Sequence, residues 1–139
     1  VIHVHHLLHN SVDIATVAAE TGVPYLMTLH DYHTICPSYT LLDPDGHECR
    51  ACLRDREGKP DRPCTASNGS STSLADYQSV METFLSGAVQ LFAPNVRARD
   101  IVTECYPSLK ASITVVEHAS KRDGNDFAVK VFRLLRGET

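Results

Sequence analysis

The sequence has no tryptophan and few aromatic residues of any kind, 6% of its 139 residues. It also has no apolar run of about 18 residues, the length that a helix needs to cross a bilayer, so we expect no membrane-spanning helix. Basic residues are in the minority, 13 against 17 acidic ones, and they form no long cluster. Because binding to nucleic-acid phosphates needs a basic face, this balance argues against a nucleic-acid partner.

The signature loops of several enzyme classes are also missing. The chain has no G-x-G-x-x-G or G-x-x-x-x-G-K-[ST] phosphate loop, no H-E-x-x-H zinc motif and no G-x-S-x-G nucleophile motif. Phosphate binding through a glycine-rich loop is therefore not expected. The first residues, VIHVHHLLHN, carry histidine where a secretory signal peptide has a charged head and an apolar body. We expect a cytoplasmic location. Peripheral contact with the inner face of the membrane is compatible with it.

Apolar periodicity alternates between strand spacing and helix spacing along the chain. Strands are predicted over residues 1–8, 25–30, 88–93 and 113–116. Helices are predicted over residues 11–21, 73–87 and 95–105. Alternation of this kind is typical of an α/β domain with a mostly parallel, Rossmann-like sheet and helices on both faces. The length fits one such domain.

A stretch without regular apolar pattern, residues 32–72, separates the second strand from the second helix and holds four of the five cysteines. Connections this long are usually functional, disordered or held by something other than a core. The four cysteines have the spacing C-x12-C-x2-C-x11-C and are Cys36, Cys49, Cys52 and Cys64. A C-x2-C knuckle lets two thiolates reach one tetrahedral ion, so a structural zinc site is a candidate, with His47 as a substitute ligand.

Two other interpretations of these cysteines stay open. They are reduced thiols in a loop, or disulfides if the compartment is oxidising, although an unpaired fifth cysteine argues against disulfides. That fifth residue, Cys105, lies on a predicted helix, and we expect it to be a small buried hydrophobe.

Polar side chains collect at the carboxyl ends of the predicted strands, where a parallel sheet binds its ligands. They are His5, His6, His30, Asp31, Asn95, Glu117 and His118. Any single histidine has an ordinary surface or core role as its alternative. A histidine followed directly by aspartate can supply a base to a hydroxyl, and the carboxylate biases its protonation. Adjacent strand side chains point apart, so Asp31 is alternatively a turn cap.

Four segments occur together in this chain. H-V-H-H-L-L lies near the start, L-H-D-Y-H-T-I-C-P-S-Y-T-L-L-D-P-D-G follows the second predicted strand, A-P-N follows the third, and V-V-E-H follows the fourth. Over residues 1–119 this combination resembles the family 4 (group 1) glycosyltransferases. The most specific part is H-D-Y-x-x-x-C-P-x-x-x-L-L-D-x-D-G with the cysteines behind it.

The resemblance implies the GT-B architecture, in which two Rossmann-like domains face each other across a cleft. The first domain mainly contacts the acceptor, here a glycan or lipid-linked acceptor, and the second binds a nucleotide-sugar donor. Residues 1–119 would be a partial first domain, and residues 120–139 a linker with the start of a second domain. The chain alone would then be inactive, as part of a retaining enzyme of surface polysaccharide synthesis without a catalytic metal.

Carried over residue by residue, the resemblance makes His30 and Asp31 the catalytic candidates, near the transferred sugar. The substrate-binding candidates are His5, His6, Asn95 and His118. Asn95 stands where the family has serine, which is a mild departure. Two rival hypotheses come from other classes of protein: a small zinc-stabilised binding module without catalysis, and a metal-dependent hydrolase. The hydrolase would use His3, His5, His30 and Asp31. It ranks lowest because the spacing of these residues matches no recognised metal motif.

Overall fold

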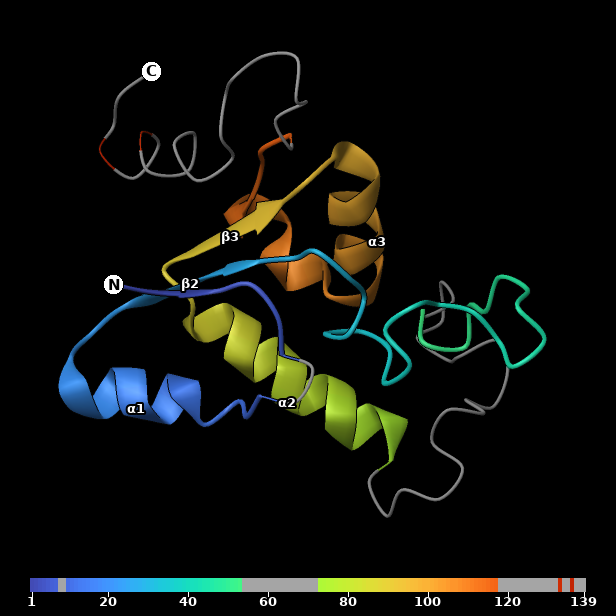
Figure 1. Ribbon diagram of the computed structural model, residues 1–139, viewed down its shortest axis with the longest axis horizontal. Coiled ribbons are helices and arrows are strands. Elements are labelled where there is room, and N and C mark those ends of the chain that lie inside the picture. Colours follow the sequence, from blue (N-terminus) through green and yellow to red (C-terminus); the bar gives the residue numbers. More distant parts are fainter. Residues whose placement is uncertain (8–9, 54–72, 118–132, 134–135, 137–139) are drawn as a thin grey trace.

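The structure is a computed structural model that describes residues 1–7, 10–53, 73–117, 133 and 136 (Figure 1). Its elements are β1 (Ile2–Val4), α1 (Ile14–Thr21), β2 (Tyr25–Thr28), α2 (Leu74–Gly87), β3 (Gln90–Ala93), α3 (Val96–Cys105), the 3-10 helix η2 (Pro107–Ser112) and β4 (Ile113–Val115). Cys64, His118 and nearly all of residues 120–139 lie outside the described residues. None of the helices described here has the length and apolar character to cross a membrane.

The four strands form one parallel sheet in the order β1-β2-β3-β4, which confirms the predicted α/β class. Ile2 pairs with Tyr25, Leu26 with Gln90, and Leu91 with Ile113. Each strand is shorter than its apolar run predicted, and β1 ends at Val4 rather than near residue 8. Because all strands run the same way, their carboxyl ends meet at one edge of the sheet.

The three α-helices share one face of the sheet. Sequential strand order with right-handed crossovers places every crossover helix on the same side. Accordingly one buried cluster joins strand residues to residues of every helix, and it includes Val4, Met27, Leu91, Ala18, Phe84 and Val102. Of the described helices, then, none covers the other face, and the prediction of helices on both faces holds for one face only.

The opposite face carries the alternate strand residues. Leu26 and Phe92 are buried there and form a second, small cluster with Val116. The register places His3 opposite Leu26, so His3 and the fully buried Thr28 belong to this face. Polar groups of β1 and β2 are therefore aligned on the side of the sheet away from the helices.

Local capping explains where the helices begin and end. Gly22 has φ 66°, the left-handed conformation that favours glycine, and it ends α1 as predicted. The Ser73 side chain accepts a hydrogen bond from the Asp76 N–H and begins α2. Helix α1 begins three residues later than predicted, because the Ser11 hydroxyl accepts the Asp13 N–H in a turn before it.

The cysteine-containing loop is held to the core by side chains of α2 and by Tyr106. The Tyr77 hydroxyl donates to the His33 carbonyl, and the Tyr106 hydroxyl donates to the Thr34 carbonyl at 2.6 Å. Described residues of this loop form no helix or strand, apart from an isolated antiparallel bridge. Yet several of them join the main core, namely Ile35, Cys36, Leu41, Cys52 and Leu53. The expectation that something other than a core holds the loop is therefore wrong for this part of it.

A contact between α2 and β2 gives a test of this packing. A Cβ atom added to Gly87 would lie 2.6 Å from the Tyr25 hydroxyl oxygen, which is buried and donates to the Phe84 carbonyl. We expect Gly87→Ala to lower the free energy of unfolding by about 1–3 kcal/mol, because the clash outweighs a helix-propensity gain of at most about 1 kcal/mol. Urea unfolding measures the change.

The matched control removes the clashing atom. In a Tyr25→Phe background the next ring atoms lie 3.6 and 3.8 Å from the added Cβ, which is ordinary contact. Gly87→Ala should then be neutral or stabilising by up to about 1 kcal/mol. An equal loss of stability in both backgrounds would contradict this account of the packing.

Candidate functional site: a histidine cluster at the strand ends

Three histidine rings gather where β1 and β2 end. His5 Nδ1 and His30 Nε2 are 3.0 Å apart, and their rings stack with centroids at 5.3 Å. The His3 ring lies against His5 with a centroid distance of 3.9 Å, and its Nε2 is 2.8 Å from the Thr28 hydroxyl. The parallel register causes this meeting, because it carries the chain after Val4 alongside the chain after Thr28. The structure thus brings two predicted residues, His5 and His30, into direct contact.

Electrostatics separate the half-buried His3 from the exposed His5 and His30. Burial, with the positive charges that His5 and His30 can carry, lowers the pKa of His3 to about 4. At neutral pH His3 is consequently an uncharged hydrogen-bonding partner of Thr28. His5 and His30 are exposed to solvent, so they are the rings that a ligand can reach.

Asp31 makes two contacts, of which the turn cap was predicted from the sequence and the pair with His6 was not. One carboxylate oxygen accepts the His33 N–H at 2.7 Å, which makes the turn cap. The other is 2.5 Å from His6 Nδ1, in an ion pair when His6 is protonated. Asp31 therefore orients the His6 ring, and both of its carboxylate oxygens contact groups of this chain. Neither Asp31 contact involves His30, although the two residues adjoin in the sequence.

The remaining predicted site residues are not gathered at the cluster. Asn95 follows β3, and its side chain accepts the Ala98 N–H at 2.8 Å as the N-cap of α3. Glu117 is exposed after β4, and His118 lies outside the described residues. A structural role thus accounts for the Asn95 amide oxygen. Thr28 was not predicted, and His3 was named only in the hypothesis of a metal-dependent hydrolase, although the alternation of histidine in V-I-H-V-H-H was a signal for it.

The paired rings of His5 and His30 can pass a proton. Two imidazoles that share a hydrogen bond need one N–H and one lone pair, so the pair holds one proton between its rings. A hydroxyl group that approaches Nδ1 of His30 or Nε2 of His5 meets a base whose proton has a second nitrogen to move to. The arrangement suits activation or orientation of a hydroxyl.

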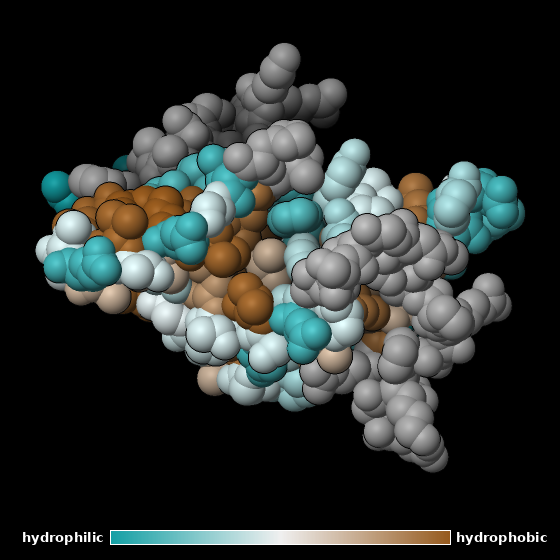
Figure 2. Space-filling view, turned by 90° about the horizontal axis from the view of Figure 1, so that it is seen from below, coloured by the Kyte–Doolittle hydropathy of each residue, from teal (hydrophilic) through white to brown (hydrophobic). Residues whose placement is uncertain are grey.

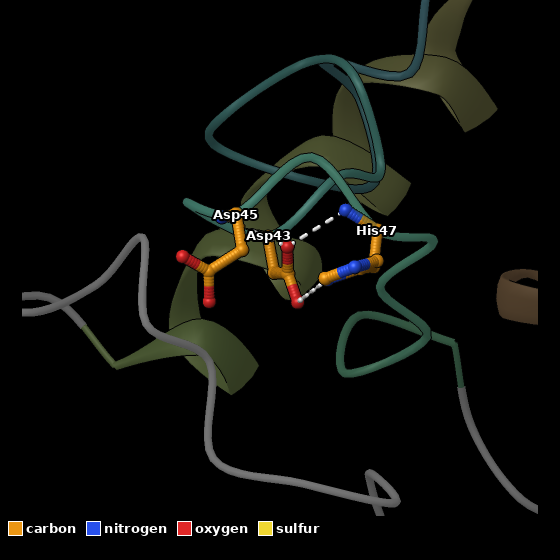
Figure 3. Close-up of side chains that lie close together, drawn as sticks. All are labelled: Asp43, Asp45 and His47. Carbon is orange, nitrogen blue, oxygen red and sulfur yellow. Dashed lines mark hydrogen bonds and ion pairs between the residues drawn. The ribbon is translucent and has the colours of Figure 1, made fainter.

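The predicted zinc site stays a prediction, because Cys64 lies outside the described residues. Among the described residues, the set of three ligand atoms that lie within 4.8 Å of one another comes from Asp43, Asp45 and His47 (Figure 3). Asp43 already accepts the backbone N–H groups of residues 45 and 47, so the turn accounts for this exposed cluster. Cys36, Cys49 and Cys52 carry free thiols and do not converge to that distance as a set of three.

A groove of about 810 Å³ lies between α1 and α2, at the amino end of β2. It is lined mainly by small and apolar residues, among them Ala15, Ala19 and Val80. Hydrophobic residues are gathered on this side of the molecule, as the view from below the helices shows (Figure 2). The histidine cluster is at the other end of β2. The titratable side chains that contact one another are at the histidine edge and not in the groove, so we place the candidate site at the histidine edge.

Comparison of the chain with protein-family models, with curated proteins and with solved structures gives no match.

The depressed pKa of His3 predicts a pH dependence of stability. The unfolded chain takes up a proton at about pH 6.5 and the folded chain only at about pH 4, so the unfolded state binds more protons between these values. Stability contributed by neutral His3 is complete above pH 6.5 and falls as the pH drops towards 4. Urea unfolding at a series of pH values should show this loss.

Substitutions test whether His3, and not another histidine, causes this pH dependence of stability. His3→Gln keeps an amide near the Thr28 hydroxyl but removes the titrating ring, so the loss of stability between pH 6.5 and about pH 4 should shrink. His47→Gln, in an exposed turn, should keep the wild-type dependence. Identical pH profiles for His3→Gln and the wild type would contradict the assignment.

The capping role of Asn95 is tested separately. Asn95→Ala should lower the free energy of unfolding by about 1 kcal/mol, because the Ala98 N–H loses its acceptor. Asn95→Asp should retain the wild-type stability within about 0.5 kcal/mol, since aspartate caps as well. If alanine costs no more than aspartate in chemical denaturation, the capping assignment is wrong.

Proposed function

We propose that this chain is the acceptor-side part of a glycosyltransferase that moves a sugar from a nucleotide-sugar donor to a glycan or lipid-linked acceptor. The observation that carries the proposal is the contact between His5 and His30, two residues that the family resemblance assigned to one cleft from separate segments. The parallel Rossmann-like sheet is compatible with the first domain of a GT-B enzyme.

In this proposal His30 is the catalytic residue and His5 its partner. His30 orients the acceptor hydroxyl and accepts its proton at Nδ1, while the proton on His30 Nε2 moves to His5 Nδ1 across the 3.0 Å contact. His3 and Thr28 position the His5 ring from the buried side. Asp31 keeps His6 at the rim of the site rather than acting on substrate itself.

Donor recognition is proposed to lie outside residues 1–119. Transfer from a nucleotide sugar needs a leaving diphosphate stabilised by cations or helix N-termini. The sequence has no glycine-rich phosphate loop to supply this. With the family resemblance as its basis, the proposed reaction is a retaining transfer in polysaccharide synthesis at the cytoplasmic side of the membrane, with the nucleotide bound by a second domain.

The test is a transfer assay on the complete gene product that contains this chain. With a panel of nucleotide sugars and saccharide acceptors, the protein should release nucleoside diphosphate in step with glycosylated product. His30→Ala should lower kcat by about 10²- to 10⁴-fold, the usual contribution of a positioned acid–base group. His47→Ala, an exposed histidine remote in sequence from the cluster, is the matched control and should retain the wild-type rate.

Two outcomes would count against the proposal. Transfer at the wild-type rate by His30→Ala would remove His30 from the mechanism. Absence of nucleoside diphosphate release with every donor, from a protein that circular dichroism shows to be folded, would remove the enzyme assignment and favour the binding module without catalysis.

A further inference from the structure

The groove between α1 and α2 has an aromatic floor. Tyr25 and Phe84 line it, and their rings stack with a centroid distance of 5.2 Å. Both residues are buried, and the Tyr25 hydroxyl donates to the Phe84 carbonyl, which ties the start of β2 to α2. Because close packing and this hydrogen bond hold the two rings, the floor is formed before any partner arrives.

Small side chains form the walls of the groove. Ala15 and Ala19 come from α1, and Ser79, Thr83 and Gly87 come from α2. Small residues on two neighbouring helices let a third helix approach closely, so that its larger apolar side chains fill the space between them. The groove lies on the helical face, where apolar side chains gather at the surface (Figure 2).

Helix α1 buries little of its own surface. Of its eight residues, Ala18 is buried, and across the groove Val80 of α2 is 49% exposed. Helices shorter than about 12 residues are marginal by themselves and take their stability from an apolar face that is packed. A partner that covers the open side of α1 therefore gains binding energy from apolar surface that this chain leaves in water.

Two carboxylates give the groove a negative charge. Asp13 and Glu20 are among its described lining residues, which include no lysine, arginine or histidine. The two acidic residues are seven positions apart, so they lie on the same side of α1, about two turns or roughly 10 Å apart. Both are exposed, and within the part of the chain that the structure describes neither carboxylate makes an ion pair or a hydrogen bond.

This charge decides between a second copy of the chain and a different partner. A two-fold pair of grooves would bring Asp13 and Glu20 of both copies, four carboxylates, into one interface, where like charges repel. The same charge disfavours the anionic surface of a membrane. A helix with lysine or arginine at two positions seven residues apart matches the groove, because its cations are also roughly 10 Å apart.

We propose that the groove between α1 and α2 docks a basic amphipathic helix of a partner protein. The apolar stripe of that helix lies on the floor of Tyr25 and Phe84, and its two cations pair with Asp13 and Glu20. The groove is at the amino end of β2 and the histidine cluster is at the other end, so the docked helix leaves the histidines accessible. The proposal stands independently of the proposed transfer reaction.

The experiment titrates the full chain into two labelled synthetic peptides of about 16 residues, or four helical turns, with fluorescence anisotropy as the readout. Both peptides have leucines at i, i+3, i+4 and i+7, and two positions seven residues apart are lysine in one peptide and glutamate in the other. At low salt the lysine peptide should bind about 5- to 30-fold more tightly, the ratio that two exposed ion pairs supply. The double variant Asp13→Lys, Glu20→Lys should reverse this preference.

A second pair of variants tests the groove rather than its charge. Ala19→Gln places an amide in the wall and should weaken binding of the lysine peptide about 10-fold, because a polar group buried without a partner is costly. Val17→Gln is the matched control, since Val17 is exposed on the same helix but does not line the groove. Its affinity should stay within about 2-fold of the wild type.

Several results would overturn the proposal. Absence of saturable binding of either peptide to the chain, shown to be folded by circular dichroism, is one, and equal affinity for the two peptides is another. Unchanged binding by Ala19→Gln would place the peptide elsewhere on the surface. Self-association of the wild-type chain that Ala19→Gln abolishes, measured by analytical ultracentrifugation, would make a second copy the occupant of the groove.

Discussion

Parallel pairing of β1 with β2 sets Ile2 opposite Tyr25 and so determines which residues meet beyond the strand ends. A slip of one residue would move His3 to the helix-covered face and separate it from Thr28. With the observed register, the rings of His3, His5 and His30 lie against one another on the face of the sheet away from the described helices. The register is enforced by the core, since Val4 and Met27 are buried against the helices while the histidines alternate with them.

The same core holds the loop that follows the histidine cluster. Residues 31–53 contain almost no regular structure, yet several of their backbone carbonyls accept hydrogen bonds from side chains of α2 and from Tyr106. A loop fixed in this way keeps His30 and Asp31 at a defined place although they follow the end of β2.

The sequence allowed the fold class and the placement of all four strands and three helices to be predicted, because apolar periodicity reports which face of an element is buried. Strand ends were less certain, since β1 stops at Val4 while its apolar run continues. His5 and His30 could be predicted to share an edge, but not that they touch, because contact depends on register and rotamer. The role of Gln78 and Tyr106 in holding the loop could not be predicted. A sequence does not distinguish a polar side chain that donates to a distant backbone carbonyl from one at the surface.

The central claim is that the histidine edge of the sheet binds a saccharide hydroxyl. The most direct measurement is NMR of the imidazole resonances of the folded chain while mono- and disaccharides are added. The account predicts that the ring signals of His5 and His30 shift together and saturate, whereas the signal of His47 does not move. Unchanged His5 and His30 signals, or shifts of equal size at His47, would contradict it.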